Sequence, residues 1–360
     1  MTAVADPLAA IAEVTPAFSD EKAIEIVRDV YGLSVTVKSL VSERDQNLQL
    51  RTPSGEQFVL KIANAAEDPA VTDFQIEALL HIGRFVEVHS TPINAPTVLQ
   101  TLAGESHVIL SADDQTHVAR VVSYIAGVPV GNRTPSPRLS RNQGAYLANL
   151  GRALAEFEHV GCHQALLWDI QQALQLRDLA KHIPQAAVHA DVIAALNDFE
   201  RFAWPKFGSL RRQVVHSDFN PDNILVDSAS SDEVVGVIDF GDMLEAPLIA
   251  DVAIAASYAR PDEGDPLTLI AELVAGYASV TPLLQDEIDI LFELVKARLC
   301  ASIVLLYWRA SFRDANDPYL EKIMAGESFS EHFLSRLNSI PRDHAIQMFR
   351  QVHASVLRAN

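Results

Sequence analysis

The 360-residue chain has few cysteines, few positive charges for its length and no long apolar run. Its two cysteines, Cys162 and Cys300, are too few for a disulfide framework or for a zinc site made of several thiolates. The 28 Lys and Arg residues stand against 47 Asp and Glu, which gives a net charge of −19. A surface this acidic repels phosphate backbones and anionic lipid. We therefore expect no nucleic-acid partner and no binding to a membrane surface.

The apolar segments of this sequence are short. The most apolar one, 244–256, is interrupted by acidic residues and is too short to span a bilayer. Residues 1–10 lack the basic stretch and the apolar run of a secretory signal. We therefore expect a cytoplasmic protein. The hydrophobic content of 49% is nevertheless ample for a core, and the length suits one large domain or two modest ones.

The hydrophobic pattern changes character near residue 125. Upstream, alternating β-branched segments predict strands at 34–41, 46–51, 57–62, 97–102 and 118–125, with 107–111 as a further candidate. Two helices are predicted to begin at the N-caps Ser19 and Asp68 and to cover 20–31 and 69–84. Downstream, the helical period predicts helices over 139–160, 170–181, 186–202, 267–279, 284–311 and 343–360. The sequence thus predicts an α+β fold, with a sheet-rich N-terminal lobe over 1–125 and a larger, mostly helical lobe over 126–360.

One polar segment interrupts the helical half and carries the sharpest chemical signal. Asp218 is followed five residues later by Asn223, which precedes a short apolar strand, 224–226. A second strand, 234–238, ends at Asp239, so a hairpin would bring the three polar side chains together at its open end. Phosphoryl transfer requires a carboxylate beside the acceptor hydroxyl, and an amide and a second carboxylate can hold the metal ions. The segment therefore predicts a phosphoryl-transfer site.

These residues resemble the aminoglycoside phosphotransferase and choline kinase superfamily, which is related to the protein kinases. The likeness rests on a His-x-Asp-x-x-x-x-Asn loop, here 216–223, and on the metal motif Ile238-Asp239. It is closer to the hydroxylysine kinases and their bacterial relatives. This closer likeness includes residues 157, 159, 168–170 and 246–253. The resemblance implies a bilobal, protein-kinase-like fold whose small lobe is an antiparallel sheet.

The resemblance also implies roles for the residues of this loop. Asp218 accepts the proton of the acceptor hydroxyl, and Asn223 and Asp239 hold Mg²⁺. His216 and Asp251 brace the loop rather than carry protons. In the superfamily, glycine is usual at the position between His216 and Asp218, whereas this chain has a serine, which is also small.

Further acids and an aromatic residue are candidates for the acceptor side. Asp242 and Glu245 follow the metal carboxylate, and they either hold a substrate ammonium or are solvated acids. Trp168 and Asp169 either line the acceptor side or belong to the core. The sequence leaves both alternatives open.

The phosphate-binding part of the small lobe departs from the protein kinases. The Gly-x-Gly-x-x-Gly loop is missing, which argues against a protein kinase, and the polar loop 42–47 takes its place. Its backbone N–H groups and the Ser42 hydroxyl would cover the phosphates, unless the loop is an ordinary hairpin turn.

The remaining nucleotide contacts are implied by the resemblance. Lys61 lies on the strand face opposite the apolar run, and Glu77 follows sixteen residues later on the next helix, as the Lys–Glu pair of the family requires. The backbone of Ser123 and Ile125 would meet the edge of the nucleobase. Because backbone groups do not select one base, both ATP and GTP stay open as donors.

The expected function is therefore a small-molecule kinase. The resemblance implies an acceptor that carries an amino group and a hydroxyl, with 5-hydroxylysine as the best single candidate, and the acidic composition suits a cationic acceptor. Two alternatives are an antibiotic-modifying aminoglycoside phosphotransferase and a catalytically silent, nucleotide-binding regulatory domain. A silent domain usually loses the catalytic Asp or the metal carboxylate, whereas Asp218 and Asp239 are both present here.

Overall fold

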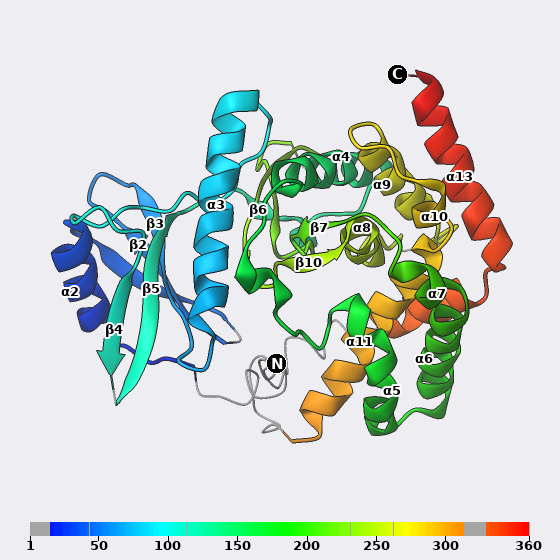
Figure 1. Ribbon diagram of the computed structural model, residues 1–360, viewed down its shortest axis with the longest axis horizontal. Helices are drawn as coiled ribbons and strands as arrows, with labels where there is room; N and C mark the ends of the chain where they lie inside the picture. Colours follow the sequence, from blue (N-terminus) through cyan, green and yellow to red (C-terminus); the bar gives the residue numbers. More distant parts are fainter. Residues whose placement is uncertain are drawn as a thin grey trace. The chain divides into compact units, whose positions relative to one another are not determined.

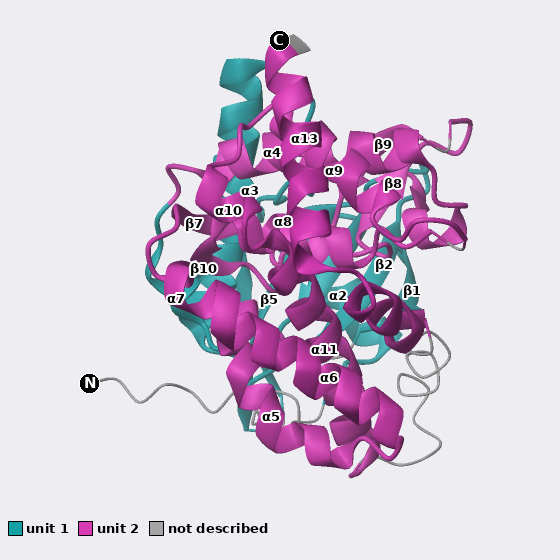
Figure 2. Ribbon diagram, turned by 90° about the vertical axis from the view of Figure 1, so that its right-hand side faces the viewer, with its two compact units in different colours: residues 1–126, 158–165 teal, residues 127–157, 166–360 magenta. Residues whose placement is uncertain are grey.

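The computed structural model describes residues 15–42, 44–112, 114–230, 232–261, 263–312 and 329–359. The chain divides into two compact units (Figure 2). Unit 1 comprises residues 1–126 and 158–165, and unit 2 comprises residues 127–157 and 166–360. Unit 1 carries the larger sheet and unit 2 is mostly helical, so the predicted α+β fold class is confirmed.

Unit 1 is built on a five-stranded antiparallel sheet with the strand order β1-β2-β3-β5-β4 (Figure 1). Its strands are β1 (Thr36–Leu40), β2 (Gln46–Arg51), β3 (Gln57–Ile62), β4 (Val108–Ala112) and β5 (Gln115–Ser123). Leu60 and Ile62 of β3 are fully buried in a core shared with α2 (Asp20–Tyr31). Alternation along the strand places Lys61 on the opposite face, in register with Arg120 of β5.

Both helices predicted in unit 1 begin at the expected N-caps. The Ser19 hydroxyl accepts a hydrogen bond from the Lys22 N–H (3.2 Å) at the start of α2. The Asp68 carboxylate accepts one from the Ala70 N–H (2.9 Å) at the start of α3 (Pro69–His89). Helix α3 continues five residues beyond the predicted end at 84, to a left-handed C-cap at Ser90.

One predicted strand of unit 1 is wrong. In the segment 97–102 only Val98 forms an isolated bridge, with Val122. The chain then turns, because the Thr101 N–H donates to the Glu105 carbonyl (2.8 Å) and Gly104 takes a φ of +83°. The edge position of the sheet is instead filled by β4, which the candidate strand 107–111 anticipated.

The segment 158–165 joins unit 1 by packing on α3. It contains η2 (Val160–His163), a short 3₁₀ helix. A Cβ atom on Gly161 would lie 2.2 Å from the Ala70 carbonyl oxygen, so only glycine permits this approach. The His159 ring also contacts the Asp73 carboxylate (3.2 Å).

Unit 2 is mostly helical and carries two small sheets. Its longer helices are α4 (Pro137–Leu154), α6 (Ala186–Asp198), α8 (Leu248–Ser257), α9 (Thr268–Ala278), α11 (Leu291–Ala310) and α13 (Arg342–Ala359), and residues 329–338 are also helical. One sheet has the order β6-β8-β9, and β7 pairs with β10. These strands are β6 (Val128–Pro129), β7 (Arg212–Val215), β8 (Ile224–Val226), β9 (Val234–Val237) and β10 (Leu244–Pro247). None of the helices that the structure describes is both long and apolar enough to cross a membrane.

Three predicted helices of unit 2 are interrupted. The segment 170–181 forms η3 (Ile170–Gln175), α5 (Leu176–Leu179) and η4 (Ala180–His182), of which two are 3₁₀ helices. Predicted helix 284–311 splits into α10 (Gln285–Ile288) and α11. At this break the Arg342 side chain donates a hydrogen bond to the Asp289 carbonyl (2.7 Å). In a continuous helix that carbonyl would instead accept a backbone N–H from the next turn.

The third interruption lies in the predicted helix 186–202. Helix α6 is followed by η5 (Phe199–Ala203), a π-helical turn, and then by α7 (Trp204–Phe207). Pro205 has no N–H to donate to the Arg201 carbonyl four residues earlier, and its ring would collide with that carbonyl in a regular helix. The wider π-helical turn avoids this collision.

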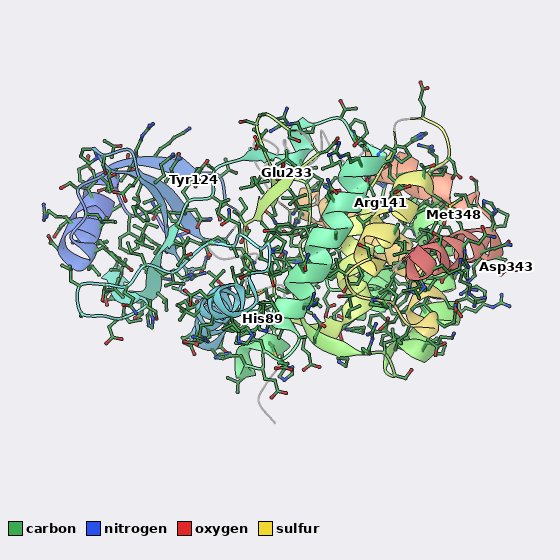
Figure 3. The ribbon with its side chains drawn as sticks, turned by 90° about the horizontal axis from the view of Figure 1, so that it is seen from above. His89, Tyr124, Arg141, Glu233, Asp343 and Met348 are labelled. Atoms are coloured by element: carbon green, nitrogen blue, oxygen red, sulfur yellow. The ribbon has the colours of Figure 1, made fainter. Side chains whose placement is uncertain are left out.

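Helices α4 and α9 of unit 2 cross at two glycines. A Cβ atom on Gly276 of α9 would lie 1.8 Å from the carbonyl oxygen of Arg141, which Figure 3 labels on α4. A Cβ atom on Gly144 of α4 would lie 2.0 Å from the Leu273 carbonyl oxygen. Backbone therefore packs directly on backbone at this crossing.

We expect Gly276→Ala to destabilise unit 2 by about 3 kcal/mol, because the added methyl group must push two helices apart. Gly83→Ala is the matched control, since Gly83 lies inside α3 and its Cβ atom would meet nothing within 4 Å. The control should gain about 0.5–1 kcal/mol from its better helix propensity. Urea denaturation followed by circular dichroism measures both variants. Equal midpoints for the two variants would contradict the close crossing.

Candidate active site

The loop 216–223 joins β7 to β8 and fixes the Asp218 carboxylate. Its Oδ2 atom accepts hydrogen bonds from the side-chain amides of Asn220 (2.8 Å) and Asn223 (2.7 Å). Asn223 also donates to the Asp218 carbonyl (3.0 Å), and the Asn220 Oδ1 accepts the Asp222 N–H (2.8 Å). Because these bonds engage Oδ2, the Oδ1 oxygen is the one with which Asp218 can accept a further proton.

The hairpin of β8 and β9 brings Asp239 to the same loop, as the sequence predicts. The Ile238 N–H donates to the Asn223 carbonyl (2.9 Å), so Asp239 directly follows a residue bonded to Asn223. Asp239 has a left-handed backbone, with a φ of +62°. The Asn223 amide nitrogen faces Asp218, so the Asn223 side chain can offer its oxygen to a cation, and the Asp239 carboxylate offers further oxygen donors. Such donors fit Mg²⁺.

His216 and Asp251 hold the loop from beneath. The buried Asp251 carboxylate on α8 accepts the backbone N–H groups of His216 (3.1 Å) and Ser217 (2.8 Å). Ser217 has a φ of +63°, which explains why glycine suits this position in the superfamily.

The partners of His216 define its protonation state. Its Nδ1 atom accepts the Asp218 N–H (3.3 Å), and its Nε2 atom faces the Ile238 carbonyl (3.2 Å) and must therefore carry the hydrogen. Complete burial lowers the pKa of His216 to about 4. The ring is thus neutral at physiological pH and connects the loop to the end of β9.

Arg298 is a site residue that sequence analysis missed. It lies on α11 with only 7% of its side chain exposed, and its Nη2 atom lies 3.4 Å from the Asp218 Oδ1 atom and 3.3 Å from the Tyr258 hydroxyl. The sequence gives no signal that singles it out, because α11 also carries Glu293, Lys296 and Arg309. Burial raises the pKa of Asp218 to about 7 and the charge of Asp242 adds to this, whereas Arg298 and the Asn220 hydrogen bond oppose it.

Asp242 belongs to the same cluster, and Trp168 orients it. The indole N–H of Trp168 donates to the Asp242 Oδ2 atom (2.9 Å), and the Arg309 guanidinium lies 5.7 Å from the Trp168 ring centroid. The neighbouring Asp169 is buried and caps η3 through the Gln171 N–H (2.9 Å). Trp168 is therefore both buried and in contact with a site carboxylate.

Glu245 lies in a different environment from Asp242. It is on β10 opposite Val214, and its carboxylate forms an ion pair with Arg212 (2.8 Å). About a third of each side chain is exposed. A protein cation therefore already accompanies Glu245.

The residues expected to contact the nucleotide all lie in unit 1. Lys61 on β3 is partly buried beside Arg120, which is 2% exposed and donates to Gln75 of α3. Glu77 lies two residues further along α3 and is partly buried. Sequence analysis missed the Arg120–Gln75 contact. Ser42 is half-buried in the loop that follows β1.

The chain segment after β5 contains the two residues expected to meet the base. The Ser123 N–H is donated to the Thr97 carbonyl (2.8 Å), and the Ser123 hydroxyl accepts the Thr97 N–H (2.9 Å). A base could therefore meet the Ser123 backbone only at its carbonyl. Ile125 is 6% exposed.

A carboxylate positioned by two amides, with a hairpin carboxylate nearby, is an arrangement that phosphoryl transfer can use. The chain belongs to the phosphotransferase enzyme family, whose sequence model matches residues 36–284. It is 28% identical to a hydroxylysine kinase of Danio rerio, over 94% of this chain and 99% of that protein. The predictions of the superfamily and of a small-molecule kinase are thereby confirmed.

Two solved structures show the same fold. A microcompartment-associated aminopropanol kinase superposes with a TM-score of 0.66 at 19% identity, covering 89% of this chain and 98% of that one. An amicoumacin kinase, solved with AMP-PNP, Ca²⁺ and its antibiotic, also gives a TM-score of 0.66, at 14% identity, covering 91% of this chain and 97% of that one. The predicted bilobal kinase-like fold class is thus confirmed.

We expect Asp251→Asn to change how stability depends on pH. Burial raises the pKa of Asp251 from 3.8 to about 6, so between these pH values the folded chain holds a proton that the unfolded chain has lost. This group's contribution to the free energy of unfolding therefore falls by about 2 kcal/mol as the pH rises from 4 to 6. Without the carboxyl group, the unfolding free energy should rise more, or fall less, over the same range.

Chemical denaturation at pH 4.5 and 6.5 measures this difference. Asp178→Asn is the control, because Asp178 is an exposed acid on α5, and it should keep the pH dependence of the unsubstituted chain. If Asp251→Asn keeps that dependence as well, Asp251 does not take up a proton on folding in this range.

Proposed function

We propose that this kinase transfers the γ-phosphoryl group of ATP or GTP to the hydroxyl of an amino-bearing small molecule, with 5-hydroxylysine as the best single acceptor. The observation that carries the proposal is the Asp218 carboxylate, held at Oδ2 by two amides and placed beside the hairpin carboxylate Asp239. This is the arrangement that phosphoryl transfer to an alcohol needs.

In this proposal Asp218 is the catalytic base. The acceptor oxygen attacks the γ-phosphorus, the bond from that phosphorus to the bridging oxygen of the leaving diphosphate breaks, and the hydroxyl proton passes to Asp218 Oδ1. Arg298 lies 3.4 Å from this oxygen and favours its ionised form. Asn223 and Asp239 would hold Mg²⁺, which neutralises charge on the nucleotide phosphates when it is bound.

The nucleotide contacts are proposed for unit 1. Lys61 would meet the α- and β-phosphates with Glu77 orienting it, and Ser42 would cover the phosphates from the loop between β1 and β2. The base would meet the Ser123 carbonyl and the Ile125 backbone. The amicoumacin kinase solved with AMP-PNP and Ca²⁺ supports a nucleoside triphosphate and a divalent cation as requirements of this fold.

The acceptor ammonium would bind Asp242. Asp242 and Glu245 are both candidates from the sequence, but Glu245 is paired with Arg212, whereas Asp242 belongs to the acidic cluster around Asp218. The likeness to a hydroxylysine kinase over nearly the whole chain supports an amino acid with a hydroxyl group. The aminopropanol kinase fold supports amino alcohols more broadly.

An aminoglycoside acceptor is the second candidate. The observation that favours it is the fold likeness to an antibiotic kinase. A catalytically silent regulatory domain is disfavoured, because Lys61, Asp218, Asn223 and Asp239 are all present. A panel of 5-hydroxylysine, ethanolamine, choline, homoserine and kanamycin, assayed for diphosphate release with Mg²⁺ and ATP or GTP, separates these functions. Turnover of kanamycin alone would favour the antibiotic function, and turnover of none would count against the proposed acceptors.

We expect Asp218→Asn to lower kcat for 5-hydroxylysine by about 10³-fold, because the amide cannot accept the hydroxyl proton. Nucleotide affinity, measured by calorimetry, should stay within about twofold. Asp227→Asn is the matched control, since Asp227 lies at the turn of the same hairpin and accepts the Ala229 N–H (2.7 Å). A kcat near that of the unsubstituted enzyme in Asp218→Asn would exclude Asp218 as the base.

We expect Asp242→Asn to raise KM for 5-hydroxylysine by about 10–100-fold, the loss of one charge-assisted hydrogen bond to an ammonium. The asparagine oxygen can still accept the Trp168 N–H, so the local structure should persist. Glu245→Gln is the matched control, and it should change KM by less than threefold because Arg212 already accompanies that carboxylate. Steady-state kinetics at saturating nucleotide measure both variants. A larger effect in Glu245→Gln would assign the ammonium to the other acid.

A further inference from the structure

The side chain of Asp242 is held by a segment that lies 74 residues earlier in the chain. There the indole N–H of Trp168 donates to the Asp242 Oδ2 atom (2.9 Å). Further along both segments, the Gln171 side-chain amide donates to the Glu245 carbonyl (3.1 Å). The two segments are therefore joined at both ends, and both belong to unit 2.

The Trp168 ring has little freedom to move. Trp168 is 9% exposed, and the guanidinium of the buried Arg309 on α11 lies 5.7 Å from its ring centroid. The next residue, Asp169, is also buried, and its carboxylate accepts the Gln171 N–H (2.9 Å) at the start of η3. Because the ring is covered on its face and its backbone is fixed by this cap, the indole N–H is held in place toward Asp242.

The donor that holds Asp242 differs in charge from the one that holds Glu245. An indole N–H is a neutral donor, so it orients the Asp242 carboxylate without offsetting its negative charge. The Glu245 carboxylate is instead paired with Arg212 (2.8 Å), which also donates to Gln171 (2.7 Å). Carboxylate oxygens can accept more than one hydrogen bond each, so a carboxylate held by an indole can also accept an ammonium N–H.

Asp242 is a side chain that needs to be held. Its negative charge acts on Asp218, in the same cluster of acids, and like charges repel each other. An Asp242 side chain without the indole bond would be freer to turn away from Asp218, and an arriving ammonium would have to order it again. Binding that must order a side chain is weaker than binding to a side chain that is already in place.

We infer that Trp168 is a positioning residue for the acceptor, because through Asp242 it fixes the place where the acceptor ammonium binds. Trp168 contacts the carboxylate and not the reacting atoms, so it acts on acceptor binding rather than on the chemical step. The inference rests on the proposed function, since it takes Asp242 as the residue that binds the ammonium.

Trp168→Phe tests this role, because it removes the N–H and keeps an aromatic ring. We expect KM to rise by about three- to tenfold for 5-hydroxylysine, or for whichever amine of the panel is turned over best, which is the effect of ordering one side chain on binding. KM for the nucleotide and kcat should stay within about twofold. Benzothienylalanine at position 168 keeps the outline of the ring and replaces the N–H by sulfur, so it should raise KM similarly without loss of packing. Trp204→Phe makes the same change at an exposed tryptophan on α7 and should leave every constant within about twofold.

A double-mutant cycle with Asp242→Ala separates a role through Asp242 from a merely structural one. Once the carboxylate is gone, Trp168→Phe should raise the acceptor KM by less than about twofold. A full three- to tenfold rise in that background, an equal rise in the nucleotide KM, or an unchanged acceptor KM in both variants at position 168 would each overturn the inference. If Asp242→Ala raises the acceptor KM and the variants at position 168 do not, only this inference fails. If Asp242→Ala itself leaves the acceptor KM unchanged, the proposed ammonium site at Asp242 fails, and the inference fails with it.

Discussion

The contact between the Asp251 carboxylate and two consecutive backbone N–H groups, of His216 and Ser217, is the constraint on which the candidate active site depends. It fixes the entrance of the loop to the buried helix α8 and holds Ser217 in a left-handed conformation that a serine does not favour. Asp218 follows directly after Ser217, and Asn223, five residues later, contacts its carboxylate. The neutral His216 ring then couples the loop to the strand end that carries Asp239. The Asp218 carboxylate, which we propose as the base, is thus positioned through the buried side chains of Asp251 and His216.

The electrostatic balance of this site follows from the same crowding. Asp218, Asp239 and Asp242 gather in one cluster, in which Asp218 forms an ion pair with Arg298 (3.4 Å). Repulsion among the three acids is costly in a partly buried site. A bound divalent metal and a cationic acceptor would both relieve this repulsion. The charge of the cluster therefore favours the two ligands that the proposed reaction requires. Part of the chain's excess of acidic residues is therefore concentrated in this cluster.

Sequence analysis predicts correctly those features that depend on residues close together in the chain. The N-caps at Ser19 and Asp68, the hairpin of β8 and β9, and the approach of Asp218 to Asn223 all depend on contacts within a few residues. Arg298 lies 80 residues from Asp218, and only the packing of α11 brings the two together. Likewise, the break before α11 coincides with a hydrogen bond from the distant Arg342 side chain of α13. No local pattern encodes such contacts, which is why sequence analysis missed them.

The small helix η2 has a consequence for the modularity of the chain. Because 158–165 packs on α3 through Gly161 while its flanking residues belong to unit 2, the backbone passes between the units three times. A gene segment ending after the first sheet would leave this part of unit 1 behind, with the α3 surface around Ala70 and Phe74 uncovered. The two units are therefore not interchangeable cassettes. Recombination between relatives must therefore carry the small sheet and this distant segment together.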